Sequence, residues 1–149
     1  MQIEKIKIAD LSDVKVITKL ANELWTDSDI DALSKEFSEL LTDNEAFIVL
    51  KYVDALPVGF AHCQIRNEYV EGTQTNPVGY LEGIYVKPHF RKRGYAKQLL
   101  KECETWAKLK GCREFASDCQ LDNIESFKFH ISNGFSEANR IICFTKKLN

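Results

Sequence analysis

The sequence has no apolar run near the roughly 18 residues of a membrane-spanning helix, and its first residues lack the apolar stretch of a secretory signal. Basic charge is not in surplus either, because 20 lysine and arginine residues stand against 22 acidic ones, for a net charge of −2. This balance argues against a nucleic-acid binder that relies on bulk charge. We expect a cytoplasmic protein with neither a membrane nor a nucleic-acid partner.

The sequence also lacks any cysteine pattern of a metal site or a disulfide framework. Its five cysteines are odd in number and widely spaced, and no two form a C-x-x-C pair. Cys63, Cys103 and Cys143 lie among apolar residues, where a thiol behaves as a small hydrophobic group. We therefore expect no metal, and we expect Cys119, which follows Asp118, to pack rather than to react.

What the sequence does contain is the ordinary composition of a globular protein. Of its 149 residues, 44% are hydrophobic and 28% are charged. A chain of this length buries about two-thirds of the surface that it exposes when unfolded. No repeat, linker or low-complexity tract interrupts it, so we expect one domain over residues 1–149.

Apolar periodicity predicts an alternation of strands and helices. This order predicts an α/β sandwich around a mixed sheet. The expected strands cover residues 3–9, 45–53, 58–65, 78–86, 115–118 and 136–147, and the expected helices cover 11–24, 30–41, 95–110 and 123–133.

A basic loop with one glycine separates the strand 78–86 from the helix 95–110. Pro88 ends the strand, and Arg91, Lys92 and Arg93 lead to Gly94. Glycine permits close approach of backbone N–H groups, and a helix N-terminus carries partial positive charge. This combination predicts an anion site for phosphate. A solvated corner is the ordinary alternative, and a single glycine without G-K-[ST] fits neither a dinucleotide fingerprint nor a P-loop.

Arg91, Gly94 and Ala96 occupy the three defined positions of the motif Q/R-x-x-G-x-G/A. With this motif and its element order, the chain resembles the GNAT N-acetyltransferases over essentially its whole length. The resemblance implies an α/β fold with a mixed, mostly antiparallel sheet flanked by helices. It also implies that two central strands, 81–86 and 114–118, splay apart and bind acetyl-CoA between them.

The resemblance further implies which residues hold acetyl-CoA. Main-chain groups of Ile84 and Val86 would pair with pantetheine, and the Val86 N–H would point at the thioester oxygen. Asn123 matches an asparagine that contacts pantetheine, while His130 stands where many members carry a tyrosine that protonates the thiolate; a core histidine is the alternative. The expected cofactor residues are Ile84, Tyr85, Val86, Arg91, Lys92, Arg93, Gly94, Tyr95, Ala96 and Asn123.

Further segments of the sequence resemble one group within that family, the aminoglycoside 6′-N-acetyltransferases. The matching segments are residues 23–25, 66–72, 81–84, 111–114 and 116–118. The resemblance implies acetylation of the 6′-amine of aminoglycoside antibiotics, a resistance-type modification, by a homodimer. The residues that correspond to its substrate site are Trp25, Tyr69, Glu82 and Asp118, with Asn139 where a glutamate is expected.

Two of these residues, Glu82 and Asp118, are expected to be catalytic. Glu82 interrupts an apolar strand, where a buried carboxylate is costly unless it is paired or used; an outward-facing strand position is the alternative. Asp118 ends a strand at the edge where ligands gather in open α/β sheets, and helix capping is its alternative. Both carboxylates would accept the proton of an amine that attacks the thioester directly in a ternary complex.

The remaining candidate residues also have ordinary structural interpretations. Trp25 and the nearby Asp27, Asp29 and Asp31 would offer an aromatic face and carboxylates to a polycationic sugar, or they form a solvated turn at a helix N-terminus. Tyr69 lies in a polar loop, where a tyrosine often packs locally. Rival functions stay open: a GNAT that acts on a polyamine, an amino acid or a protein amine, and a non-catalytic acetyl-CoA sensor.

Overall fold

Five strands form one sheet in which each strand neighbours the next along the chain. The computed structural model describes all 149 residues. The first four strands pair antiparallel, and the fifth lies parallel to the fourth, which confirms the mixed, mostly antiparallel sheet. The strands are β1 (Glu4–Ile8), β2 (Ala46–Val53), β3 (Leu56–Arg66), β4 (Val78–Val86) and β5 (Phe115–Ala116).

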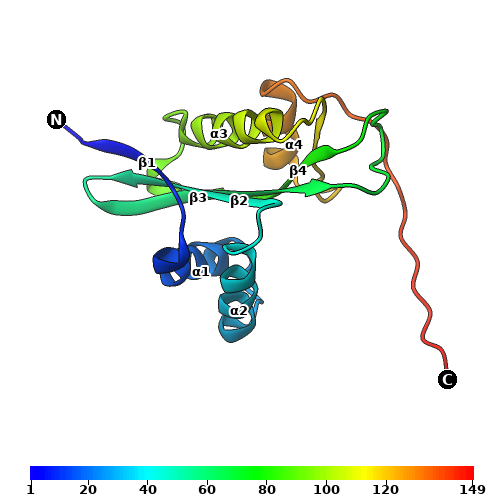
Figure 1. Cartoon of the computed structure of the whole chain (residues 1–149), viewed down its shortest axis with the longest axis horizontal. Helices are drawn as coiled ribbons and strands as arrows, with labels where there is room; N and C mark the ends of the chain where they lie inside the picture. The colour runs from blue at the N-terminus through cyan, green and yellow to red at the C-terminus, as the bar shows by residue number, and fades with distance from the viewer.

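Helices cover both faces of this sheet (Figure 1). Helices α1 (Val14–Leu24) and α2 (Ile30–Leu40) lie on one face, and α3 (Tyr95–Leu109) and α4 (Ile124–Ser132) lie on the other. None of the helices combines the length and the apolarity that a bilayer span requires.

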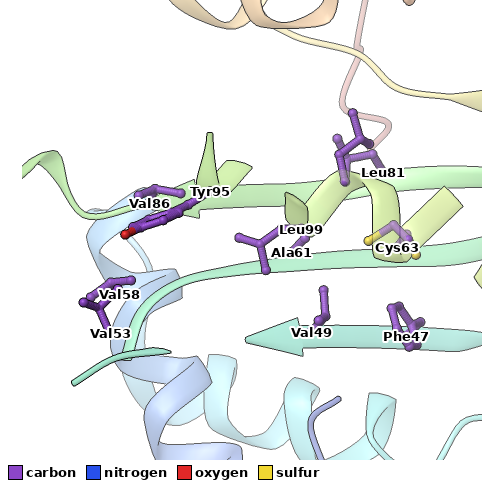
Figure 2. Close-up of a cluster of buried hydrophobic side chains, with 12 residues drawn as sticks. Phe47, Val49, Val53, Val58, Ala61, Cys63, Leu81, Val86, Tyr95 and Leu99 are labelled. Atoms are coloured by element: carbon purple, nitrogen blue, oxygen red, sulfur yellow. The ribbon is translucent and has the colours of Figure 1, made fainter. Parts of the chain in front are cut away.

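The period of β2 explains why the sheet has a core on each face. Side chains alternate along a strand, so Phe47 and Val49 join the cluster under α3, whereas Ile48 and Leu50 join the cluster with α1 and α2. Figure 2 shows the first cluster, in which Leu99 of α3 lies over the strands. Complete burial of one such side chain contributes about 1.5–3 kcal/mol, so these clusters hold the sheet and helices together.

A β-bulge interrupts β4 at Glu82. Cys63 of β3 pairs with Leu81 and His62 pairs with Gly83, so Glu82 is an extra residue with no partner across the ladder. Bulges bend a strand and redirect a side chain, and they occur often beside active sites. The alternative of a regular outward-facing position therefore does not describe Glu82.

The bulge also exchanges the two faces of β4. Before it, Leu81 packs under α3; after it, the residues that pack there are Ile84 and Val86. Tyr85 instead packs on the face of α1 and α2, and Gly83 faces Trp25 at the end of α1. One inserted residue thus gives the carboxyl half of β4 a different register from its amino half.

Strand β4 has a partner along only part of its outer edge. Strand β5 pairs with Gly79 and Tyr80, and no strand continues along Leu81–Val86 on that side. The Lys87 N–H donates to the Val58 carbonyl on β3, at 2.8 Å. Successive N–H groups of a strand point to opposite edges, so the Val86 N–H points toward the open edge.

Two expected strands differ from the structure. The strand expected over 115–118 is only two residues long, and the strand expected over 136–147 is wrong for this chain. Residues 136–149 form an extended arm that touches the β3–β4 loop at Ala138 and Asn139 and then runs away from the body (Figure 1). The apolar run from Ile141 to Phe144 favours β structure. The arm nevertheless pairs with no strand of this chain, although the outer edge of β5 is free. Along the arm, Ile141, Ile142 and Phe144 are exposed.

Candidate active site

Glu82 projects from the bulge into an ion pair with Arg66, the last residue of β3. Arg66 donates to Glu82 Oε1 from Nη2 at 2.9 Å and from Nε at 3.2 Å, and Nη2 also reaches Oε2 at 3.2 Å. The carboxylate is half-buried, with 23% of its side chain exposed. Burial of this degree is tolerated because the charge is paired.

Asp118 receives a hydrogen bond from the Tyr80 hydroxyl and does not cap a helix. The carboxylate itself is exposed, while Tyr80 is buried. Burial, together with the nearby Asp118 charge, raises the pKa of Tyr80 well above its usual value. The hydroxyl therefore keeps its proton at neutral pH and remains a donor to Asp118. The helix-capping alternative is met by Asn123, whose side chain accepts from the Ser126 N–H.

Trp25 ends α1 and lies directly against the bulge. A Cβ built on Gly83 would stand 2.7 Å from the Trp25 ring, so only glycine leaves room for the indole at this position. The ring also makes an edge contact with Phe60, with centroids 6.3 Å apart. Trp25 is 36% exposed, so it presents part of an aromatic face next to Glu82.

The acidic residues after Trp25 belong mainly to the start of α2. Asp29 caps that helix by accepting from the Asp31 N–H at 3.0 Å, and both residues are exposed. Acidic residues stabilise a helix N-terminus, so a structural role at the start of α2 accounts for these two carboxylates. Asp27 is exposed as well and has no hydrogen-bond partner in the structure.

Tyr69 and Asn139 meet at Glu71, a residue that was not among the predicted site residues. The Asn139 amide donates to Glu71 Oε1 at 2.7 Å, and the Tyr69 hydroxyl reaches Oε2 at 3.4 Å. Glu71 therefore supplies a carboxylate beside Asn139, the position where a glutamate was expected. The only sequence signal for Glu71 is its position within the matching segment 66–72.

Glu114 holds the loop that carries this cluster. Its Oε1 accepts hydrogen bonds from the Gln74 N–H and from the N–H and hydroxyl of Thr75. These bonds, with that of the Thr75 hydroxyl the largest, lower the pKa of Glu114. The loop between β3 and β4 is thereby tied to the residue that precedes β5.

A pocket of about 400 Å³ lies at the end of β4, between the basic loop and α4. Gly94 is left-handed, with φ +82°, and a Cβ at this position would meet nothing within 4 Å. The pocket therefore lies next to the helix N-terminus with no side chain in the way, which fits the pyrophosphate of a nucleotide. Its lining residues are Val86, Phe90, Arg91, Lys92, Gly94, Tyr95, Ala96, Lys97, Phe129, Ser132 and Asn133.

The side chains of this loop do not all point into the pocket. Arg91 donates from Nε to the Val86 carbonyl at 2.7 Å and so joins the loop to the end of β4. Arg93 turns away, toward Gln2 at 3.4 Å, and Tyr85 points to the opposite face, where its hydroxyl donates to Glu23 at 3.0 Å. Neither Arg93 nor Tyr85 is among the residues that line the pocket.

Tyr95 belongs to a polar cluster that no motif of the sequence indicates, in which Tyr95 and Lys51 are buried and Glu4 and Gln98 are exposed. Its hydroxyl donates to Glu4 at 3.1 Å, and the ammonium of Lys51 lies 4.5 Å from its ring centroid. Lys51 is almost fully buried and bonds to Glu4 at 2.9 Å and to Gln98 at 2.6 Å. This network fixes the first turn of α3, which borders the pocket.

Two of the three histidines, His62 and His130, have partners or burial that indicate a structural role. Burial lowers the pKa of His62 to about 4, so it is neutral at pH 7. His130 Nδ1 lies 2.6 Å from the Ser126 carbonyl, which can only accept, so this nitrogen carries the proton. Its Nε2 lies 2.8 Å from the Ser117 hydroxyl, so both ring nitrogens have a hydrogen-bond partner. No group of three or more His, Cys, Asp or Glu side chains is placed to hold a metal ion.

The open edge of β4 runs to the basic loop at Gly94, which is suited to bind an anion, and the carboxylates of Glu82 and Asp118 lie in the same part of the fold. Acyltransferases that use coenzyme A have this arrangement. The comparison with known families gives the same answer. The model of the acetyltransferase (GNAT) family matches residues 14–135, and the chain belongs to this family.

Several similar proteins share one enzymatic name. An aminoglycoside N(6′)-acetyltransferase type 1 of Acinetobacter haemolyticus is 43% identical over 97% of this chain and 99% of its own. One of Acinetobacter baumannii is 40% identical over 99% of both chains. The solved structure of AAC(6′)-Iy with a bisubstrate analogue, CoA-S-monomethyl-acetylneamine, superposes with a TM-score of 0.94 at 36% identity, covering 98% of this chain and 99% of that one.

Proposed function

We propose that this protein, a single acetyltransferase domain, transfers the acetyl group of acetyl-CoA to the 6′-amine of aminoglycosides. The observation that carries the proposal is that Trp25 and Asp118 contact β4 at Gly83 and Tyr80, on either side of Glu82. Full-length similarity to enzymes named for this reaction supports it. A second group, Tyr69, Glu71 and Asn139, adds another carboxylate to the site.

When bound, acetyl-CoA supplies an activated thioester. The N–H groups beside Gly94, with Arg91 and Lys92, would hold its phosphates, and Asn123 would contact its pantetheine. The N–H of Val86 is fixed by the β3–β4 ladder and points to the open edge. A donor fixed in this way needs no reorganisation when negative charge develops on the thioester oxygen.

The carboxylates act on the amine. An alkyl ammonium has a pKa near 10, so the free amine costs about 4 kcal/mol at pH 7. Glu82 and Asp118 would accept that proton, directly or through water, and attract the other ammonium groups of the substrate. Trp25 offers an aromatic face to the sugar rings and to their cations. The free amine then attacks the thioester carbonyl directly, the C–S bond breaks, and coenzyme A leaves as a thiol with the proton that the attacking nitrogen gives up. This step needs no nucleophile from the protein.

An assay with acetyl-CoA separates this function from its rivals. We expect rapid thiol release with kanamycin-type aminoglycosides and little with spermidine or a lysine-containing peptide. Brisk acetylation of the polyamine or peptide alone would refute the aminoglycoside as substrate. Tight acetyl-CoA binding without turnover of any amine would instead identify a sensor.

Gly83→Ala is expected to weaken binding of the amine substrate while acetyl-CoA binding is unchanged. The new methyl group would stand 2.7 Å from the Trp25 ring and displace it. Overpacking costs about 1–3 kcal/mol, so KM for the amine should rise roughly tenfold. Steady-state kinetics with each substrate varied in turn measure this effect. Trp25→Ala should reproduce the same split, and an unchanged amine KM in Gly83→Ala would show that the indole does not contact substrate.

We further propose that the protein is a homodimer joined through its C-terminal arm. The arm, residues 136–149, exposes apolar side chains, and so does one face of α4. Strand β5 leaves its outer edge without a partner. Exposed apolar surface is typical of interaction sites when it is contiguous, and a free strand edge can pair with a strand of a second copy. The exposed α4 residues are Ile124, Phe127 and Ile131.

Replacement of Phe144 by aspartate is expected to convert the dimer to a monomer. The substitution places a charge in the apolar part of the arm and leaves Asn139, at its base, in contact with Glu71. Light scattering at several concentrations measures the mass, and Lys146→Asp is the control for added negative charge. A wild-type protein that is monomeric at micromolar concentration would contradict this proposal.

We also infer a cytoplasmic, resistance-type role. All five cysteines are free, and Cys119 and Cys143 are exposed, which suits a reducing compartment. Acetylation removes the charge of the 6′-ammonium and thereby changes how the drug binds its target. Expression of the chain in a susceptible bacterium should raise the inhibitory concentration of 6′-amino aminoglycosides and of no other antibiotic class.

A further inference from the structure

We propose that Arg66 and Tyr80 are positioning residues that hold the two catalytic carboxylates, Glu82 and Asp118, as one connected unit. The inference rests on the proposed function, because it assigns those carboxylates a role in acetyl transfer. The link is a continuous chain of contacts: Glu82 to Arg66, Arg66 to Tyr80, and Tyr80 to Asp118.

Arg66 determines where the Glu82 carboxylate lies. The bulge leaves this residue without a partner across the ladder, so strand pairing alone does not fix its side chain. Three hydrogen bonds from the guanidinium of Arg66 supply the missing constraint. A planar fork holds both carboxylate oxygens at once, which a lysine ammonium cannot do.

Tyr80 contacts both Arg66 and Asp118 and so connects the two carboxylates. The Arg66 guanidinium carbon lies 3.4 Å from the centroid of its ring, so the ring orients the guanidinium by stacking. The hydroxyl of the same side chain donates to Asp118. Tyr80 itself is 8% exposed and packs with Val70 and Val78, so it is rigid.

Asp118 depends on this contact more than a strand residue would. Strand β5 ends at Ala116, two residues earlier, so no ladder holds the Asp118 backbone. The hydroxyl of Tyr80 provides the hydrogen bond that the structure gives its carboxylate. Removal of that hydroxyl would leave an exposed side chain free to rotate away from the amine.

The test places each of two variants in the wild-type enzyme and in an enzyme that lacks the carboxylate it is proposed to hold. Arg66→Lys keeps the charge and removes the fork, and Tyr80→Phe keeps the ring and removes the hydroxyl. We expect kcat/KM for the amine to fall roughly 10- to 100-fold in each, with KM for acetyl-CoA unchanged. Arg66→Lys should have almost no further effect in a Glu82→Gln enzyme, and Tyr80→Phe almost none in an Asp118→Asn enzyme. Lys101→Met removes an exposed charge from α3 and serves as the control.

The outcomes separate this inference from the proposed function. Wild-type protein that acetylates no aminoglycoside refutes the function, whatever the variants do. If the wild type is active, full activity of Arg66→Lys and Tyr80→Phe refutes the positioning roles. Effects that persist unchanged in the Glu82→Gln and Asp118→Asn backgrounds also overturn the inference, because they would indicate general structural damage. Circular dichroism and melting temperature confirm that each variant is folded.

Discussion

Glu82→Gln is expected to lower kcat for the amine roughly 10²- to 10⁴-fold at pH 7, the usual contribution of a general base. Glutamine keeps the shape of the side chain but cannot accept the proton that the ammonium must lose. Activity should recover in part as pH rises, because the free amine then becomes more abundant. Asp118→Asn should act in the same direction. Steady-state rates between pH 6 and roughly 9 measure both effects.

Cys119→Ala is the matched control for this prediction. Cys119 is exposed and adjacent to Asp118, so it is the thiol nearest to the proposed site along the chain. Because attack by the amine is direct, the variant should retain most of its activity. A stable acetyl adduct on Cys119 in intact-protein mass spectrometry, or a Glu82→Gln enzyme of normal rate at pH 7, would contradict the mechanism.

Gly94→Val is expected to abolish acetyl-CoA binding while the protein stays folded. The new side chain would enter the pocket at the point where backbone N–H groups must approach phosphate. At φ +82° a β-branched residue is also strained, at a cost of roughly 1–2 kcal/mol in stability. Nothing in the protein lies within 4 Å of its Cβ, so no clash adds to that strain. Isothermal calorimetry should show at least a roughly 100-fold loss of affinity.

The chain offers a control for this strain at the other end of the same helix. Gly111 follows α3, has φ +91°, and a Cβ at this position would also meet nothing within 4 Å. Gly111→Val should therefore lose a comparable amount of stability and still bind acetyl-CoA. Equal loss of binding in both variants would mean that strain, rather than the blocked anion loop, explains the result at Gly94.

The parts of the fold that depend on local pattern were predictable. The β4–loop–α3 segment follows the expected order, because Pro88, Gly94 and the apolar stripe of the helix act over a few residues. The arm shows the limit of such local patterns. Its apolar run from Ile141 to Phe144 favours a strand, but whether a strand forms depends on pairing with another segment, which no local pattern specifies.

Candidate residues of the site could be proposed from the sequence, but the contacts that connect them could not. Glu82 and Asp118 were predicted, whereas the bulge at Glu82 is a matter of register between β3 and β4, which one sequence does not contain. Arg66 and Tyr80 are separated from their carboxylate partners by 16 and 38 positions. Glu71 was hidden for the same reason, since its contact with Asn139 spans 68 positions.

The central claim is direct acetyl transfer to one nitrogen, and the position of the acetyl group on the product tests it most directly. The purified protein would be incubated with acetyl-CoA and a 6′-amino aminoglycoside, and the product would be characterised by mass spectrometry and NMR. We expect a single added acetyl group on the 6′ nitrogen, and no product from an analogue with a hydroxyl at that position. Acetylation at another amine, or none on any 6′-amino aminoglycoside alongside brisk acetylation of a polyamine or peptide, would contradict the account.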